Sequence, residues 1–331
     1  MIDSSHGPTK NVTPAWRHVR GIGMVALILG ATFSSSIVGC ANAEPATPPT
    51  THDDLRGGAL ATARIYSGIG ILGREAANKQ DAVTACTGTL IGPKKVITAK
   101  HCIRDDAEGP DNRIEEGLYF FVGLRETDIE KRSKVVSAKV PKAMAGGYIN
   151  YGSDVAVLEL EEAIKGVPYA LTATEHFPTS MVGKRLAMIG YGFDQEEIDG
   201  VRRVGAVTLV SNRDAALGRA FPAWGDFMKF IVDVENDPGI ASGEDDREAM
   251  ARRAFDYKLL PNYEAFVGLG TNDAQPCRND SGAPVVFEAN GLLVVWAVAS
   301  GSLKLSESSC GNYGSFVATF GPEVQAILHA P

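Results

Sequence analysis

The sequence Cys-Arg-Asn-Asp-Ser-Gly-Ala-Pro, residues 277–284, decides how the rest of the chain is interpreted. Ser281 stands between an acid and a glycine, a proline closes the segment, and a cysteine lies four residues before the serine. Alone, such a segment is a tight turn. Two other segments give it chemical meaning: Thr-Ala-Lys-His-Cys at 98–102 and Ser-Asp-Val-Ala-Val-Leu-Glu-Leu at 153–160. Together the three supply a nucleophile, a base and an orienting acid.

The candidate nucleophile is Ser281. A serine hydroxyl is a poor nucleophile at neutral pH, so it needs a base within hydrogen-bond reach and a buried acid that holds the base in one tautomer. The chain offers His101 as the base and Asp154 as the acid, in the order His, Asp, Ser. His101 is preferred over His176 because it follows an apolar strand and adjoins Cys102, where a disulfide would fix the backbone.

The composition is that of a folded chain. Of 331 residues, 44% are hydrophobic and 22% are charged, which is enough to bury a core. The net charge is −8, and no basic run of the kind that binds a phosphate backbone is present. Nucleic acid is therefore not an expected partner.

The N-terminus has the pattern of a secretory signal. Arg17 and Arg20 precede an apolar run over residues 22–33, which is short for a membrane span. The run ends in Ile-Val-Gly-Cys, which resembles the bacterial lipobox and predicts a signal peptide over residues 1–39 with a lipidated Cys40 as the first mature residue. Ordinary cleavage after Ala43 is the alternative.

The segment that follows is rich in proline. Residues 40–64 are expected to be a tether, or a propeptide, between a membrane anchor and a domain. The protein is expected to be extracytoplasmic, either lipid-anchored at the cell envelope or secreted, with the membrane met only through Cys40. Disulfides are allowed in that compartment. The four remaining cysteines fit two bridges with three possible pairings: Cys86, Cys102, Cys277 and Cys310.

The body of the chain reads as all-β. From residue 82, short strands alternate with glycine-rich turns. The predicted strands are 87–91, 95–99, 118–122, 134–140, 154–160, 185–192, 201–210, 284–287, 292–299 and 315–319. A short helix is predicted at 322–328. Residues 212–262 break the pattern and are predicted to be an inserted excursion with a helix over 244–253. The remaining strands fall into two β-rich halves that meet between residues 160 and 185.

Three motifs together resemble one family. Residues 86–102 look like the histidine region of trypsin-like (chymotrypsin-fold) serine proteases, residues 154–158 resemble their aspartate strand, and residues 277–284 are similar to their Gly-Asp-Ser-Gly-Gly-Pro motif. The chain resembles a bacterial secreted or lipoprotein member. The resemblance implies two six-stranded antiparallel β-barrels with a short C-terminal helix, and a protease domain over residues 65–331 interrupted by the insertion at about 212–262.

The resemblance also implies roles for residues. Ser281 would attack the scissile carbonyl of a protein or peptide, His101 would transfer the proton, and Asp154 would orient His101. The backbone N–H groups of Asn279 and Ser281 would form the oxyanion hole. The resemblance therefore implies a serine endopeptidase that forms an acyl-enzyme, and no cofactor and no metal are expected.

Further implications concern covalent maturation. The implied disulfides are Cys86–Cys102 and Cys277–Cys310. Family members are often zymogens, so an activating protease would cut between Arg64 and Ile65, and the new ammonium of Ile65 would pair with Asp280. The alternative is that residues 64–65 begin a strand and that backbone groups hold Asp280.

Specificity is assigned from the same alignment of motifs. Gln275 takes the place at the base of the specificity pocket, with Gly301 and Gly314 in its wall, and either Ala299 or Ser300 takes the family's serine place. Because a glutamine carries no carboxylate, we predict a preference for an uncharged side chain. The departures from the family are Lys100, Asn279 and Ala283; asparagine is the residue best able to imitate glycine at its position.

The sequence is compatible with other functions. A catalytically weak, protease-like binding module on the cell envelope is the main alternative, although such proteins usually lose a triad residue. A serine hydrolase of the esterase type would need a Gly-x-Ser-x-Gly elbow, which the chain lacks. The acidic residues at 233–244 imitate a calcium loop, but Pro238 stands where that loop needs glycine. A β-rich lipoprotein with coincidental motifs is the remaining alternative.

Overall fold

The computed structural model describes residues 58–103, 114–141, 150–194, 198–235, 247–270, 272–305 and 308–329. The predicted signal peptide, Cys40 and most of the calcium-like loop lie outside these residues. Within the described ranges no helix has the length and apolar character needed to cross a membrane.

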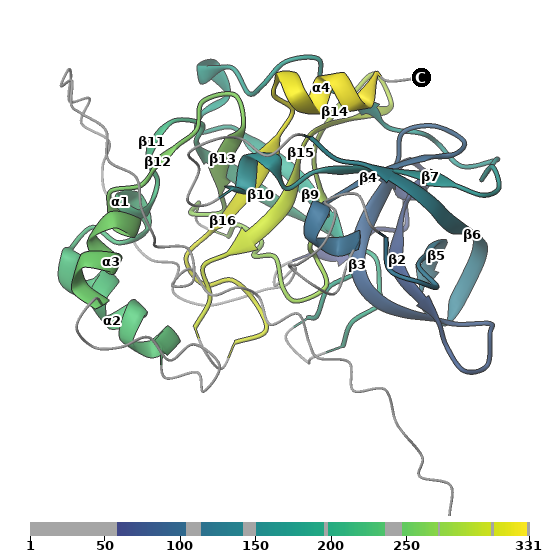
Figure 1. Ribbon diagram of the computed structural model, residues 1–331, viewed down its shortest axis with the longest axis horizontal. Helices are drawn as coiled ribbons and strands as arrows, with labels where there is room; N and C mark the ends of the chain where they lie inside the picture. The colour runs from purple at the N-terminus through teal and green to yellow at the C-terminus, as the bar shows by residue number, and fades with distance from the viewer. Residues whose placement is uncertain are drawn as a thin grey trace, which may run out of the picture.

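The first half of the chain forms a closed six-stranded antiparallel barrel (Figure 1). Its strands run in the order β2-β3-β4-β7-β6-β5 around the barrel. The bounds are β2 (Ile69–Glu75), β3 (Ala82–Leu90), β4 (Lys95–Thr98), β5 (Tyr119–Arg125), β6 (Asp128–Lys139) and β7 (Ala156–Leu160). Buried aliphatic and aromatic side chains such as Leu72, Val96 and Phe120 fill its interior.

The second half forms another ring of six strands. The ring closes because β9 pairs with both β10 and β14. The bounds are β9 (Arg185–Gly190), β10 (Arg203–Ser211), β13 (Glu264–Val267), β14 (Pro284–Ala289), β15 (Leu292–Ser302) and β16 (Ser315–Thr319). The helix α4 (Pro322–Leu328) begins with proline, which suits a first helical turn, and packs at the end of the chain. The two predicted barrels and the C-terminal helix are confirmed.

Short strands and 3-10 turns lie before, within and between the two barrels. β8 (Leu171–Thr172) lies in the connection between the barrels and pairs with β15 in parallel. Upstream of the first barrel, β1 (Ala59–Leu60) pairs with β10, and η2 (Arg64–Tyr66) forms one turn of 3-10 helix. Residues before position 65 therefore already belong to the folded part of the chain. The domain boundary predicted at residue 65 stays a prediction about cleavage. The other 3-10 turns are η3 (Lys100–Ile103), η4 (Asn150–Ser153) and η5 (Thr179–Met181).

The insertion is a small helical unit on one side of the second barrel (Figure 1). A two-stranded ribbon of β11 (Asp214–Ala215) and β12 (Lys258–Leu259) closes its base. It contains α1 (Leu217–Ala220), α2 (Trp224–Glu235) and α3 (Arg247–Phe255). The helix predicted over 244–253 corresponds to α3, whereas α2 was not predicted. Its buried residues recur at helical spacing, at Phe227, Phe230, Ile231 and Val234, and they belong to one buried hydrophobic cluster with Phe316 of the barrel.

Two strands also differ from the sequence interpretation. Strands were expected from residue 82 onward and again after residue 269, but β2 lies before the first limit and β13 before the second. All four residues of β13 are buried, so the strand lacks the alternation by which a half-exposed strand is detected. The glycines of β2 weaken its strand pattern in the same way.

Candidate active site

His101 and Asp154 lie together at one end of the first barrel. The antiparallel pair of β4 and β7 aligns Thr98 with Ala156, so the residues just after β4 and just before β7 meet. Nδ1 of His101 is 2.8 Å from Oδ2 of Asp154, and the backbone N–H of His101 donates to Oδ1 of Asp154 at 2.9 Å. The acid thus fixes both the ring and the backbone of the base.

The pair is electrostatically coupled. Burial opposes the charged form of His101, but the carboxylate of Asp154 prevails and raises the pKa of the imidazole. Burial likewise opposes ionisation of Asp154, but His101 prevails and the pKa of this carboxyl is lowered. We assign the ring proton to Nδ1, facing the carboxylate, which leaves Nε2 as the basic nitrogen. The His101 side chain keeps 32% of its surface exposed.

Ser300 is a third partner of this pair. Its hydroxyl donates to Oδ2 of Asp154. The register of β15 against β16 shifts between Ala299 and Gly301, which is a bulge at this residue. The structure therefore assigns the contact to Ser300, where the sequence left Ala299 and Ser300 open.

The Ser281 segment packs directly on the His101 segment. The carbonyl of Ser281 accepts from the N–H of Thr87 at 2.8 Å. A Cβ on Gly282 would lie 2.1 Å from Oγ1 of Thr98 and 2.9 Å from the nitrogen of Ala99. Only a residue without a side chain permits this approach, which brings the backbone beside the serine against the residues that lead to His101.

Asn279 has the backbone conformation that the sequence expected of a glycine substitute. Its φ is +72°, and its carbonyl accepts from the hydroxyl of Thr87 at 3.2 Å. The preceding carbonyl, of Arg278, accepts from the N–H of Phe193 at 3.0 Å. In the described part of the chain, the N–H groups of Asn279 and Ser281 have no acceptor. Two unpaired donors near a hydroxyl are what an oxyanion site requires.

The region predicted to be the specificity pocket is tied together by Gln275. This side chain is buried, donates to the carbonyl of Gly268 at 2.6 Å and accepts from the N–H of Gly314 at 3.2 Å. The hydroxyl of Ser302 donates to the carbonyl of Pro276 at 3.4 Å, which links the strand after Gly301 to the segment before the motif. Gln275 therefore has no polar atom left unpaired at the base.

Both implied disulfides are present. Cys86–Cys102 joins β3 to the turn that holds His101, across 16 residues of sequence. Cys277–Cys310 closes a loop of 33 residues beside the predicted pocket. The sulfur atoms of the first bridge lie within 4.8 Å of a ring nitrogen of His101; because they are bonded to each other, they offer no thiolate to a metal.

Asp280 is buried and held by backbone groups. It is 1% exposed, and its oxygens accept from the N–H groups of Cys277 and Gly192, both at 2.8 Å. Burial raises the pKa of this carboxyl to about 7, against the opposing effect of those two bonds.

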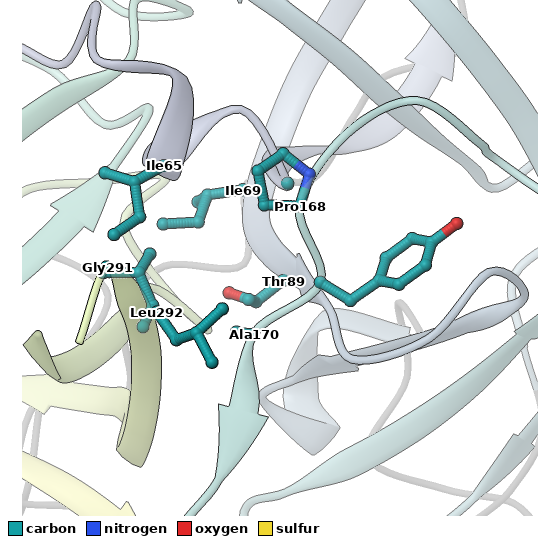
Figure 2. A pocket seen from close by; sticks show the side chains of 10 residues that line it. Ile65, Ile69, Thr89, Pro168, Ala170, Gly291 and Leu292 are labelled. Atoms are coloured by element: carbon teal, nitrogen blue, oxygen red, sulfur yellow. The ribbon is translucent and has the colours of Figure 1, made fainter. Parts of the chain in front are cut away.

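Arg64 and Ile65, the other predicted activation residues, belong to the 3-10 turn. Arg64 is exposed. The Ile65 side chain lies in a pocket beside Gly291 and Leu292 (Figure 2). Asp280 is not among the residues that line this pocket.

Three residues of the site were missed or left open by the sequence. Ser300 lies at a bulge, where a count of residues is ambiguous. Glu264 accepts from the N–H of Gly152 at 3.2 Å, a residue that lies shortly before Asp154 but is 112 residues from Glu264 in the sequence. Asp199 accepts from the side chain of Asn279 at 2.6 Å across 80 residues. No local pattern signals the last two contacts.

Comparisons with known proteins agree with this architecture. Residues 73–220 match the family described as trypsin. The solved structure of neuropsin, a serine protease expressed in the limbic system of mouse brain, has a TM-score of 0.50 and 14% identity. The match covers 82% of this chain and 96% of that one, and it shows a shared fold.

A curated relative adds a different name. Glucanase inhibitor protein 4 of Phytophthora infestans is 30% identical over 113 residues, which is 34% of this chain and 41% of that protein. The chain therefore spans about two fifths of the length of this relative.

Proposed function

This chain is trypsin-like in its fold and in the match of residues 73–220 to the trypsin family, and from that premise we propose that it is a serine endopeptidase. The observation that carries the proposal is the pair of His101 and Asp154, joined at 2.8 Å, with the Ser281 backbone packed on the segment that precedes His101. A buried acid, an oriented imidazole and an adjacent serine form the unit that makes a hydroxyl nucleophilic.

The proposed reaction has two halves. Ser281 Oγ attacks the scissile carbonyl while Nε2 of His101 takes its proton, and the N–H groups of Asn279 and Ser281 stabilise the oxyanion. His101 then passes the proton to the leaving amine, which departs and leaves an acyl-enzyme. Water, deprotonated by the same imidazole, releases the acid and restores the serine.

The substrate preference we propose is for an uncharged side chain before the scissile bond. Gln275 uses both ends of its amide on the backbone of Gly268 and Gly314, and it brings no carboxylate to pair with a cationic substrate side chain. A peptide series that differs only at this residue tests the point: rapid turnover after arginine or lysine alone would contradict it.

Activation by cleavage after Arg64 is part of the proposal. Arg64 is exposed, as an activating protease requires, and the carboxyl of Asp280 is buried beside Gly190 and Gly192, with no ion-pair partner among the residues that the structure describes. A new ammonium on Ile65 would provide one. N-terminal sequencing of the active species tests this step, and an active species that retains residues before Ile65 would contradict it.

An extracytoplasmic location fits the same proposal. Two disulfides form and persist in oxidising compartments. The lipid anchor at Cys40 remains the predicted attachment, and mass spectrometry of the N-terminal peptide would detect it.

A protease-like binding protein without turnover is the second candidate. It is favoured by the relative named as an inhibitor protein and by the departures at Asn279 and Ala283 from the family's glycines. Such a protein would keep the fold and bind its partner without forming an acyl-enzyme.

Labelling with a fluorophosphonate separates the two candidates. We expect a covalent adduct on the peptide that contains Ser281, in the protein before or after limited cleavage at Arg64, and none in Ser281→Ala. A folded protein that stays unlabelled in both forms would exclude the endopeptidase and favour the binding protein.

A further inference from the structure

Asn279 occupies a demanding position. Its N–H is one of the two proposed oxyanion donors, and the direction of that N–H depends on the conformation of the adjacent backbone. A φ of +72° is uncommon for a residue with a side chain. Asparagine tolerates this conformation better than most residues but, unlike glycine, has an amide that must find a partner of its own when it is partly buried.

The amide of Asn279 has such a partner. Its Nδ2 donates to Oδ2 of Asp199 at 2.6 Å, a short bond to a carboxylate. On the other side, the carbonyl of Asn279 accepts from the hydroxyl of Thr87. The residue is therefore held at two points, one from a strand of the first barrel and one from the β9–β10 connection of the second.

Asp199 itself is fixed by its surroundings. The next residue, Gly200, donates from its N–H to the carbonyl of Tyr191 at 2.9 Å and accepts from the N–H of Glu126 at 2.7 Å. A Cβ on Gly200 would lie 2.5 Å from the Glu126 side chain, so the connection is wedged against the first barrel. Because the adjacent backbone is fixed, the carboxylate of Asp199 can restrain the side chain of Asn279.

The electrostatic setting is consistent with this contact. Asp199 is half-buried, and burial raises the pKa of its carboxyl, whereas the bond from Asn279 and the charge of Arg278 oppose that rise. Protonated or not, the carboxyl keeps an oxygen that accepts from the amide of Asn279. The contact therefore does not depend on one protonation state.

We propose that Asp199 is a positioning residue of the oxyanion hole, whose carboxylate holds Asn279 in the left-handed conformation that points its N–H at the developing oxyanion. The inference rests on the proposed endopeptidase activity. It adds a residue that the resemblance to trypsin-like proteases does not supply, because a glycine at the position of Asn279 has no side chain to hold. Asp199 does not touch the substrate and acts only through Asn279.

The test compares Asp199→Ala in two backgrounds, the natural chain and Asn279→Gly. In the natural chain we expect kcat to fall on the order of 10- to 100-fold with little change in KM, somewhat less than the effect of removing an oxyanion donor outright. In the Asn279→Gly background the same substitution should change kcat less than about twofold, because no amide remains to be held. Asp199→Asn keeps an accepting oxygen and should retain most of the activity.

Controls separate this idea from its alternatives. Asp226→Ala removes an exposed carboxylate on α2 and should leave kcat unchanged. Equal losses from Asp199→Ala in both backgrounds, or no loss in the natural chain, would overturn the proposal.

A structural readout does not depend on turnover. A crystal structure of Asp199→Ala in which Asn279 keeps its φ and position would also overturn it. Failure of the natural chain to label with a fluorophosphonate both before and after cleavage at Arg64, by contrast, would refute the endopeptidase activity itself, and the crystal structure would still decide whether Asp199 holds Asn279.

Discussion

Replacing Gly282 with alanine would force a methyl group into the contact between the serine and histidine segments. The added Cβ would lie 2.1 Å from Oγ1 of Thr98, 2.3 Å from the carbonyl of Thr87 and 2.9 Å from the nitrogen of Ala99. Two of these atoms belong to the backbone, and the third already donates to the Thr87 carbonyl at 2.7 Å. None of them can turn aside, so the Ser281 backbone must move.

The cost follows from two effects. A residue with a side chain at a φ of +79° loses about 1 to 2 kcal/mol. Overpacking a closed contact costs about 1 to 3 kcal/mol more. We therefore expect Gly282→Ala to lower the free energy of unfolding by about 2 to 5 kcal/mol. If the serine shifts by about 1 Å, its reaction with a fluorophosphonate should slow by about 100-fold.

Urea denaturation and labelling kinetics measure the two effects separately. Gly225→Ala is the matched control, because a Cβ there would meet nothing within 4 Å and the residue lies in α2. It should be neutral or stabilising by up to about 1 kcal/mol. A Gly282→Ala protein with wild-type stability and labelling rate would refute the argument that this glycine joins the two segments.

Asp154→Asn should lower kcat about 10⁴-fold. It should also move the acid limb of the pH–rate profile to lower pH, because the carboxylate that raises the pKa of His101 is lost. Hydrolysis of a peptide ester measured across pH reports both effects. Replacing Cys86 and Cys102 with alanine opens a loop of 16 residues and should lower the free energy of unfolding by about 3 kcal/mol in urea; an unchanged midpoint would contradict this. Burial raises the pKa of Glu264 from 4.5 to about 7, so the folded state binds a proton that the unfolded state lacks between these values, and this carboxyl's contribution to stability declines as pH rises through that window. Glu264→Gln should remove that part of the pH dependence, and parallel slopes for both proteins between pH 5 and 8 would count against it.

The sequence predicts the centre of this site because its information is local. His101, Asp154 and Ser281 each stand in a short motif at a strand end, and β-strand alternation locates most strands within two or three residues. The motif order is enough to expect two barrels. The strand β13 escapes the same reasoning, since four consecutive buried residues carry no alternation. The helix α2 lies in the excursion for which only the helix at 244–253 is predicted, although the spacing of its buried aromatic and aliphatic residues is helical.

The contacts that tune the site are not local. The bond between Asn279 and Asp199 spans 80 residues and depends on how the β9–β10 connection is wedged against the first barrel. The choice between Ala299 and Ser300 depends on one bulge in β15, and a bulge reverses which side chain faces the site without changing the composition. Such features follow from tertiary packing, so a single sequence without its fold leaves them undetermined.

Two of the departures from the family pattern, Asn279 and Gln275, introduce polar side chains that have hydrogen-bond partners. Asn279 introduces a polar side chain, and Asp199 accepts from it. Gln275 introduces another, and Gly268 and Gly314 satisfy both of its ends. Buried polar groups are costly unless they are paired, and a site that decays without function has no reason to acquire such partners. The pairing therefore favours a working active site over a vestigial one, as the proposed endopeptidase requires. The lack of a carboxylate on Gln275 supports the proposed preference for an uncharged substrate side chain.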